Sequence, residues 1–358
     1  MNRIHNFSAG PAILPTEVLE ATSKAVVEYQ NFGMSVMEMS HRSKPIVAIF
    51  DEASSNLLKI MNLSSDNYSV LFLQGGASTQ FAMVALNFLS NNADYINTGS
   101  WADKAIKEAK MVGNVNVAGS SKESNFNFIP KELKLSDDAD YLHFTSNNTI
   151  FGTRFDNLPE TKSPLICDMS SDFLSRELDY SKFDLIYAGA QKNVGPAGAT
   201  LVVVKKSFLE EKGKSGLMTM MSYKTHHDKD SMFNTPPVLP VFIMNETFKW
   251  ILNTGLKNIE ETNIRKANKI YNLIDSSNGF YVGSVTDPID RSLMNVTFNL
   301  KNEELNAKFI KEATANNLDG LKGHRSVGGI RASIYNACPE TSVDALVSFM
   351  TKFMKENN

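Results

Sequence analysis

Residues 184–204 read DLIYAGAQKNVGPAGATLVVV. Two apolar runs typical of buried strands, 185–187 and 200–204, flank a loop of small residues and glycines that carries Lys192. An ammonium between buried strands loses hydration, so this placement favours a use for the amine, most often Schiff-base formation with a carbonyl. An exposed loop charge is the alternative, and partners elsewhere in the chain must decide between the two.

The bulk composition excludes several classes of protein. The 358 residues are 42% apolar and 21% charged, which is ordinary for a globular chain of about two domains. A net charge of -3 provides no basic field for nucleic acid or an anionic membrane. Cys167 and Cys338 are too few for a disulfide framework, and no apolar run is long enough to span a membrane. We therefore expect a cytoplasmic protein with neither kind of partner.

Strand-like and helix-like segments alternate through the first two thirds of the chain. Apolar runs predict strands at 68–73, 94–97, 114–118, 141–145 and 164–167. This alternation predicts an α/β fold whose large domain has a mostly parallel sheet covered by helices. After a long amphipathic helix at about 256–276, fewer strands and helices predict a smaller α+β domain. We expect a large domain at 16–255, and a small domain formed by 1–15 with 256–358.

Three features fall where α/β proteins bind ligands, at the carboxyl ends of strands. The strand at 68–73 runs into QGGASTQF and a helix, an arrangement that presents free N–H groups to a phosphate but also makes an ordinary tight turn. Trp101 stands at a strand-to-helix junction, as a stacking platform or a packed core ring. Asp168 ends a buried strand, facing a ligand or capping a helix.

Cationic residues gather at two further places. The segment GHRSVGGIRASIYNA, at 323–337, contains a predicted strand at 327–334, and Arg331 inside it needs a substrate anion or a structural carboxylate. His41-Arg42 precedes a predicted helix at about 45–61 and suits either an anion or a solvated face. His226-His227, in a predicted polar loop at 212–230, lacks a third ligand, so we interpret this pair as surface residues and expect no metal site.

Taken together, these motifs resemble the phosphoserine aminotransferase family, class V members of the fold-type-I pyridoxal-phosphate enzymes. The resemblance covers essentially the whole chain. Its motifs are NFSAGPA at 6–12, SHR at 40–42, GGAS at 75–78, SNNTIFGT at 146–153, CDMSSDFLSR at 167–176, IYAGAQKN at 186–193, FNTPP at 233–237 and the segment at 323–337.

The resemblance implies pyridoxal 5'-phosphate as the cofactor, Lys192 as its Schiff-base lysine and Asp168 as the partner of its pyridine nitrogen. The other implied cofactor-binding residues are Ala77, Ser78, Trp101, Thr149, Gln191, Asn234 and Thr235. The implied substrate-binding residues are His41, Arg42, His324, Arg325 and Arg331. Asn234, Thr235, His41 and Arg42 would come from a second subunit, so the resemblance also implies a homodimer with shared active sites.

The implied reaction transfers the amino group of L-glutamate to 3-phosphooxypyruvate, in a ping-pong cycle of L-serine biosynthesis. A glyoxylate-using aminotransferase or a desulfurase of the same fold would keep Lys192 and Asp168 and change the substrate end. A desulfurase is disfavoured, because its nucleophilic cysteine needs a mobile, exposed loop, whereas Cys167 follows an apolar strand and Cys338 precedes Pro339. A non-catalytic metabolite-binding relative would be expected to lose the lysine.

Overall fold

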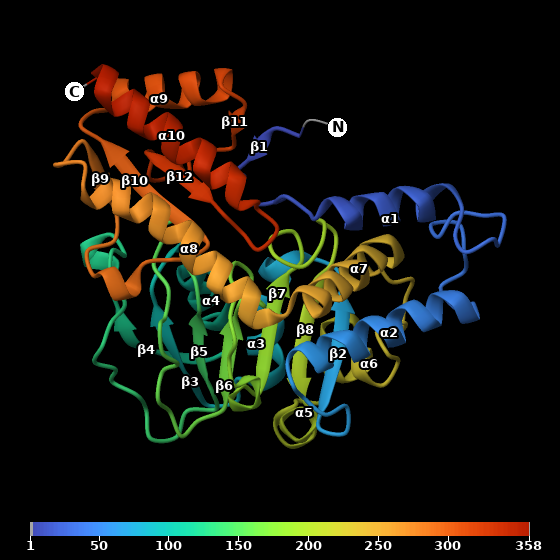
Figure 1. Ribbon diagram of the computed structural model, residues 1–358. Helices are drawn as coiled ribbons and strands as arrows, with labels where there is room; N and C mark the ends of the chain where they lie inside the picture. Colours follow the sequence, from blue (N-terminus) through green and yellow to red (C-terminus); the bar gives the residue numbers. More distant parts are fainter. Residues whose placement is uncertain (1–2, 358) are drawn as a thin grey trace.

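The computed structural model describes residues 3–357, and its centre is a seven-stranded sheet with the strand order β2-β8-β7-β6-β5-β3-β4 (Figure 1). Its strands are β2 (Tyr68–Leu73), β3 (Asn92–Asn97), β4 (Asn114–Ser120), β5 (Leu142–Thr145), β6 (Leu165–Asp168), β7 (Leu185–Gly189) and β8 (Thr200–Lys205). Strands β3 to β7 pair in parallel, and β8 is antiparallel to both of its neighbours. The predicted mostly parallel sheet is confirmed.

Helices cover both faces of this sheet because its strands are apolar on both sides. In β2, Tyr68 and Phe72 face one core while Leu71 and Leu73 face the other. The first core contains α2 (Lys44–Ile60) and α7 (Val238–Thr254). The second core is closed by α3 (Gly76–Phe88), α4 (Ser100–Ala109), α5 (Lys206–Lys212) and α6 (Tyr223–His227).

The C-terminal part has a sheet and a core of its own. Strands β9 (Tyr281–Gly283), β10 (Asn295–Leu300) and β12 (Ile330–Ser333) form an antiparallel sheet in the order β12-β10-β9. The helices beside it are α8 (Leu256–Asp275), α9 (Glu303–Ala315) and α10 (Glu340–Asn357). Figure 1 shows these helices beside the sheet. Their apolar faces and the sheet share one core.

The start of the chain returns to this C-terminal part. Strand β1 (His5–Asn6) pairs in parallel with β11 (Leu318–Asp319), and α1 (Thr16–Val27) follows. The predicted division into 16–255 and 1–15 with 256–358 remains a prediction, and residues 1, 2 and 358 lie outside the described part. Helix α8 begins directly after Gly255, whose φ of +84° also ends α7.

Two local predictions were wrong in their bounds. The strand expected at 327–334 begins only at Ile330, because Gly328 and Gly329 have φ near +68° and form a turn instead. The segment at 212–230, expected to be a loop, contains helix α6, whose start is capped by the Ser222 hydroxyl accepting a hydrogen bond from the amide of Thr225.

Candidate active site

Lys192 lies in the loop between β7 and β8, where its side chain is half-buried. Its Nζ donates a hydrogen bond to Thr149 Oγ1 at 2.9 Å. The loop leaves β7 through Gly189, where an added Cβ would stand 2.7 Å from Gln191 Oε1, so a larger residue would displace the Gln191 side chain. The backbone carbonyl of Gln191 in turn accepts a hydrogen bond from the amide of Ala12 at 2.8 Å. The lysine is therefore held between two distant parts of the chain.

Desolvation by burial lowers the pKa of Lys192 to about 8, and the positive charge of Arg331 acts in the same direction. The negative charges of Asp168 and Asp172 oppose this shift. An amine with such a pKa has a neutral fraction near pH 7 that is far larger than that of an ordinary lysine. Lys192 can therefore act both as a nucleophile and as a proton carrier.

Asp168 is the last residue of β6 and is only 3% exposed. Burial raises the pKa of its carboxyl group, while the hydrogen bond from Ser170 and the charge of Lys192 hold it down. Oδ1 of Asp168 accepts a hydrogen bond from the amide of Ser170 at 2.9 Å. The backbone that follows forms turns and no helix, so helix capping, the alternative interpretation of Asp168, does not apply.

Trp101 lies in the first turn of α4, and its ring centroid is 5.9 Å from Lys192 Nζ. Its indole Nε1 is buried and has no hydrogen-bond partner among the described residues. A buried donor without a partner is costly, and is typical of a site that is completed by a bound molecule.

Sequence reasoning missed Lys104, whose Nζ lies 4.2 Å from the centroid of the Trp101 ring. Its position three residues after Trp101 on one helix was the available signal.

The Gly75-Gly76 turn begins helix α3, with Gly75 at a φ of +94°. A Cβ at Gly75 would lie 2.2 Å from Thr79 Oγ1, so this turn needs glycine for space as well as for conformation. Ala77 and Ser78 stand in the first helical turn, whose N–H groups have no acceptor within the helix. The turn can therefore present N–H groups and the positive dipole end to an anion.

Arg331 on β12 points its guanidinium toward the same region. Its Nη1 donates to the backbone carbonyl of Thr149 at 3.1 Å, and its Nε is buried without a partner among the described residues. No ion pair to Arg331 exists within residues 3–357, so a structural carboxylate is not its partner. Thr149 thus bonds Lys192 through its hydroxyl and Arg331 through its carbonyl, which brings the amine and the guanidinium to one place.

His324 shares a cavity of about 470 Å³ with Arg331. Its Nδ1 is 2.7 Å from Ser326 Oγ, and burial together with the charges of Arg331, Arg325 and Lys104 lowers its pKa. Arg325 is exposed and does not line this cavity. The structure therefore brings two of these three predicted cations together and leaves Arg325 at the surface.

The remaining predicted residues lie on another part of the same chain. His41 and Thr235 line a separate hollow of about 400 Å³, and none of Lys192, Asp168 and Arg331 lines it. His41 Nε2 is buried without a partner among the described residues, and Arg42 is exposed. Asn234 is exposed and its Nδ2 reaches Gln74 Oε1 at 3.5 Å, next to the Gly75 turn. One chain alone does not bring His41 to Lys192.

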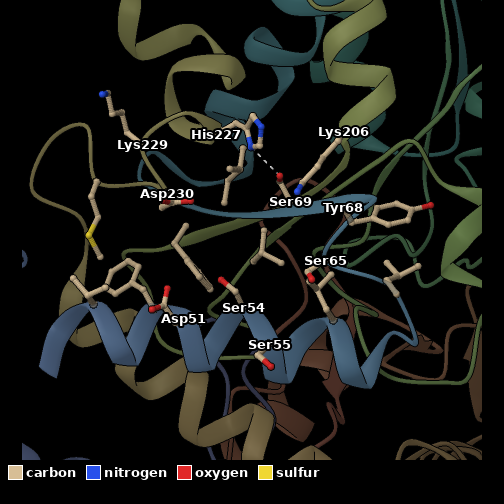
Figure 2. Close-up of a pocket in the computed structure, with 18 of the residues that line it drawn as sticks. Asp51, Ser54, Ser55, Ser65, Tyr68, Ser69, Lys206, His227, Lys229 and Asp230 are labelled. Carbon is tan, nitrogen blue, oxygen red and sulfur yellow. Dashed lines mark hydrogen bonds between the residues drawn. The ribbon is translucent and has the colours of Figure 1, made fainter. Parts of the chain in front are cut away.

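A further cavity, of about 730 Å³, contains none of the predicted site residues. It lies between α2 and the edge strand β2, and Figure 2 shows Asp51 and Ser54 of α2 facing Ser69 and His227 across it. The prediction that His226-His227 lies at the surface was wrong for His226, and His227 is partly buried. His226 is 4% exposed and bonds the carbonyl of Met220, while His227 Nδ1 is 2.8 Å from Ser69 Oγ, because the pair belongs to helix α6 packed against β2.

Residues 3–357 offer neither a metal centre nor a membrane span. No group of three or more histidine, cysteine, aspartate or glutamate side chains could hold a metal ion there. None of the described helices combines the length and the apolar character that crossing a membrane requires.

Known proteins match the whole chain. The sequence model of the family Aminotransferase class-V matches residues 4–346. The phosphoserine aminotransferase of Desulfosudis oleivorans is 51% identical over 99% of each chain, and that of Bacillus subtilis is 46% identical over 100% of each. The solved phosphoserine aminotransferase from Bacillus circulans subsp. alkalophilus is 50% identical, covers 99% of each chain and superposes with a TM-score of 0.96. This chain belongs to the class-V aminotransferases and groups there with the phosphoserine aminotransferases.

Proposed function

We propose that this class-V aminotransferase transfers the amino group of L-glutamate to 3-phosphooxypyruvate, giving O-phospho-L-serine and 2-oxoglutarate. The observation that carries the proposal is the placement of Lys192, with a lowered pKa, beside Asp168 and an Arg331 that has no carboxylate partner in residues 3–357. Full-length relatives named phosphoserine aminotransferase support the choice of substrates.

The residues present fit pyridoxal 5'-phosphate. A solved relative from Trichomonas vaginalis, 40% identical with a TM-score of 0.92, is described as phosphoserine aminotransferase with bound pyridoxal phosphate. In this chain the buried Nε1 of Trp101, which has no partner among the described residues, fits a ring-binding site beside Lys192. The cofactor phosphate would be held by Ala77, Ser78 and Gln191, its ring oxygen by Thr149, and its ring would stack on Trp101. When bound, this cofactor supplies an aldehyde that exchanges with amines and a ring that withdraws electrons from the substrate α-carbon.

Asp168 and Lys192 divide the acid-base work. Asp168 would hold a proton on the pyridine nitrogen, because a carboxylate beside that nitrogen favours its charged form. Lys192 would carry the proton between the substrate α-carbon and the cofactor. Arg331 would bind the α-carboxylate that both amino-acid and keto-acid substrates present, and its planar fork suits two carboxylate oxygens.

The far end of the substrate is assigned to His324 and Arg325 together with His41 and Arg42 of a second copy. Glutamate carries a carboxylate there and phosphooxypyruvate a phosphate, so a single group of cations would serve both half-reactions. Since His41 and Thr235 share a hollow away from Lys192, this assignment requires a homodimer in which Asn234 and Thr235 also reach the partner's cofactor.

Exposed apolar side chains near those residues support such an assembly. Phe32, Met34, Met37 and Phe233 are between 43% and 53% exposed, an unusual cost for side chains that would stay in water. The location we predict remains the cytoplasm, in keeping with two free cysteines.

The burial of both cysteines argues against a desulfurase. Cys167 is 0% and Cys338 is 2% exposed, and burial raises the pKa of both thiols, that of Cys338 to about 11. Neither can supply a reactive thiolate. Glyoxylate-using aminotransferases from Nostoc and Bacillus subtilis are only 15% and 12% identical to this chain, so they share its fold alone.

A coupled assay tests the proposal. We expect glutamate-dependent turnover with 3-phosphooxypyruvate to exceed turnover with unphosphorylated hydroxypyruvate by at least about 30-fold in kcat/KM, since losing one buried ionic contact costs that much. Equal use of both keto acids, or a preference for glyoxylate, would reject the assignment of substrate while leaving the aminotransferase class intact.

A further inference from the structure

The most deeply buried lysine of residues 3–357 lies outside the site described above. Lys266, on helix α8, is 0% exposed. Its Nζ donates to the backbone carbonyls of Ile334 at 3.0 Å, Tyr335 at 2.8 Å and Cys338 at 3.1 Å. An ammonium has three N–H donors, so these three carbonyls satisfy it completely.

No carboxylate forms an ion pair with Lys266 in the described part of the chain. The ionisable groups that act on Lys266 are the buried thiol of Cys338 and, after it, Glu340, which is already paired at the surface with Arg265 and Lys269. Burying an ammonium without a counter-ion is expensive, and an apolar residue would avoid that expense. The buried charge is therefore explained by the hydrogen bonds that it donates to the irregular segment 334–338 after β12.

Segment 334–338 is hydrogen-bonded to the loop that carries Lys192. The backbone amide of Asn336 donates to Asn193 Oδ1 at 3.0 Å, and Asn193 is the residue directly after Lys192. The side chain of Asn336 is fixed from two sides, donating to the carbonyl of Leu174 at 2.8 Å and accepting from Asn263 Nδ2 at 2.9 Å. An unbroken series of hydrogen bonds and backbone thus runs from the ammonium of Lys266 to the lysine loop.

We propose that Lys266 is a positioning residue for Lys192, acting through segment 334–338 and the Asn336–Asn193 hydrogen bond. It touches neither substrate nor cofactor. Its role is to keep the C-terminal part of the chain, which also carries Arg331, in register with the lysine loop. The expected effect on turnover rests on the proposed function, whereas the effect on the loop itself does not.

The test compares three variants of the holoenzyme. Lys266→Met keeps the length of the side chain and removes its donors. Lys269→Met, one turn further along α8, is the control, because it removes a lysine that is paired only with the surface carboxylates of Glu340 and Asp344. Asn193→Ala breaks the proposed link at its other end without disturbing the buried ammonium. The readouts are hydrogen exchange of residues 190–196 and the separate values of kcat and KM.

We expect Lys266→Met and Asn193→Ala each to speed hydrogen exchange at 190–196 by about 3- to 10-fold, the effect of losing one net hydrogen bond. We expect kcat to fall by a similar factor, with KM for glutamate within about 2-fold of wild type, because the binding groups remain. Lys269→Met should change neither readout.

The double variant decides whether the two residues act as one unit. If Lys266 works through Asn193, the combined loss should be no greater than the larger single loss. The proposal is overturned if the losses multiply, or if Lys266→Met speeds exchange in α8 to α10 but not at 190–196. Should Lys266→Met fail to fold, an unchanged loop in Asn193→Ala would overturn it. A protein that shows the exchange effects but no transamination would instead reject the proposed function.

Discussion

Two groups of candidate residues differ in how far a single chain assembles them. Lys192, Asp168, Thr149 and Arg331 come from four separate parts of the sequence, yet they are buried or half-buried, and hydrogen bonds through Thr149 join the lysine to the arginine. Of the cations assigned to the far end of the substrate, His324 shares a cavity with Arg331, but Arg42 and Arg325 are exposed and His41 lies in a separate hollow.

This difference follows from what each group can gain from folding. The lysine group sits at strand ends and in loops fixed by the sheet, so its geometry is settled when the core packs. Mutually repelling cations gain nothing from one another, and they require an anion or a second chain to bring them together. We therefore propose that one chain positions the residues for the general chemistry by itself, whereas substrate selection needs a second copy.

Changing Asp168 to Asn tests the group that a single chain assembles around Lys192, and this change should have the largest effect. We expect kcat to fall by about 10²- to 10⁴-fold, because an amide cannot hold the positive charge on the pyridine nitrogen. KM should change little. Steady-state kinetics with glutamate provide the measurement, and turnover near wild type would show that this carboxylate is not needed.

Stability should respond to the same substitution in the opposite direction. Since burial raises the pKa of Asp168, the folded chain binds this proton more tightly than the unfolded chain, and the free energy of unfolding falls as the pH rises from the ordinary carboxyl pKa to the raised value. The amide of the Asp168→Asn variant does not ionise, so at neutral pH the melting temperature of the variant should be equal to or higher than that of wild type. A clear fall would indicate a structural rather than a functional charge.

Replacing Arg331 and Arg325 separately distinguishes the group that a single chain assembles from the dispersed cations. Arg331→Ala should reduce kcat/KM for glutamate and for phosphooxypyruvate alike, by roughly 30- to several-thousand-fold, because each presents an α-carboxylate. Arg325→Ala should damage phosphooxypyruvate more than glutamate, because a phosphate carries more charge for the missing fork to neutralise. The ratio of the two kcat/KM values is the readout, and an unchanged ratio in Arg325→Ala would place phosphate recognition elsewhere.

Most of the fold could be predicted because local signals agreed with it. The run YSVLFL is β2 at the predicted bounds, and helices α2 and α8 begin and end within a residue or so of expectation. The strand around Arg331 was predicted too long, because glycine conformation at 328 and 329 overrode the apolar pattern. His226 was misjudged because its burial depends on helix α6 packing against β2, a long-range contact that no local pattern encodes.

Candidates for the site residues could be named from sequence, but the contacts between them could not. Thr149 was expected to serve the cofactor, and nothing in the sequence indicated that its carbonyl also bonds Arg331. Lys266 looks like any lysine of an amphipathic helix, and only tertiary packing reveals its three carbonyl partners.

Mixing two inactive chains tests the central claim most directly. Lys192→Ala removes the proposed Schiff-base lysine, and Arg42→Ala removes a residue assigned to the neighbour's site. A mixed dimer should therefore contain one intact site, with Lys192 from one chain and Arg42 from the other. After subunit exchange of equal amounts, we expect about a quarter of wild-type activity, since half of the dimers are mixed and each of these has one working site. Activity no greater than that of the separate variants, with exchange verified by mass spectrometry of tagged chains, would contradict a site shared between two copies.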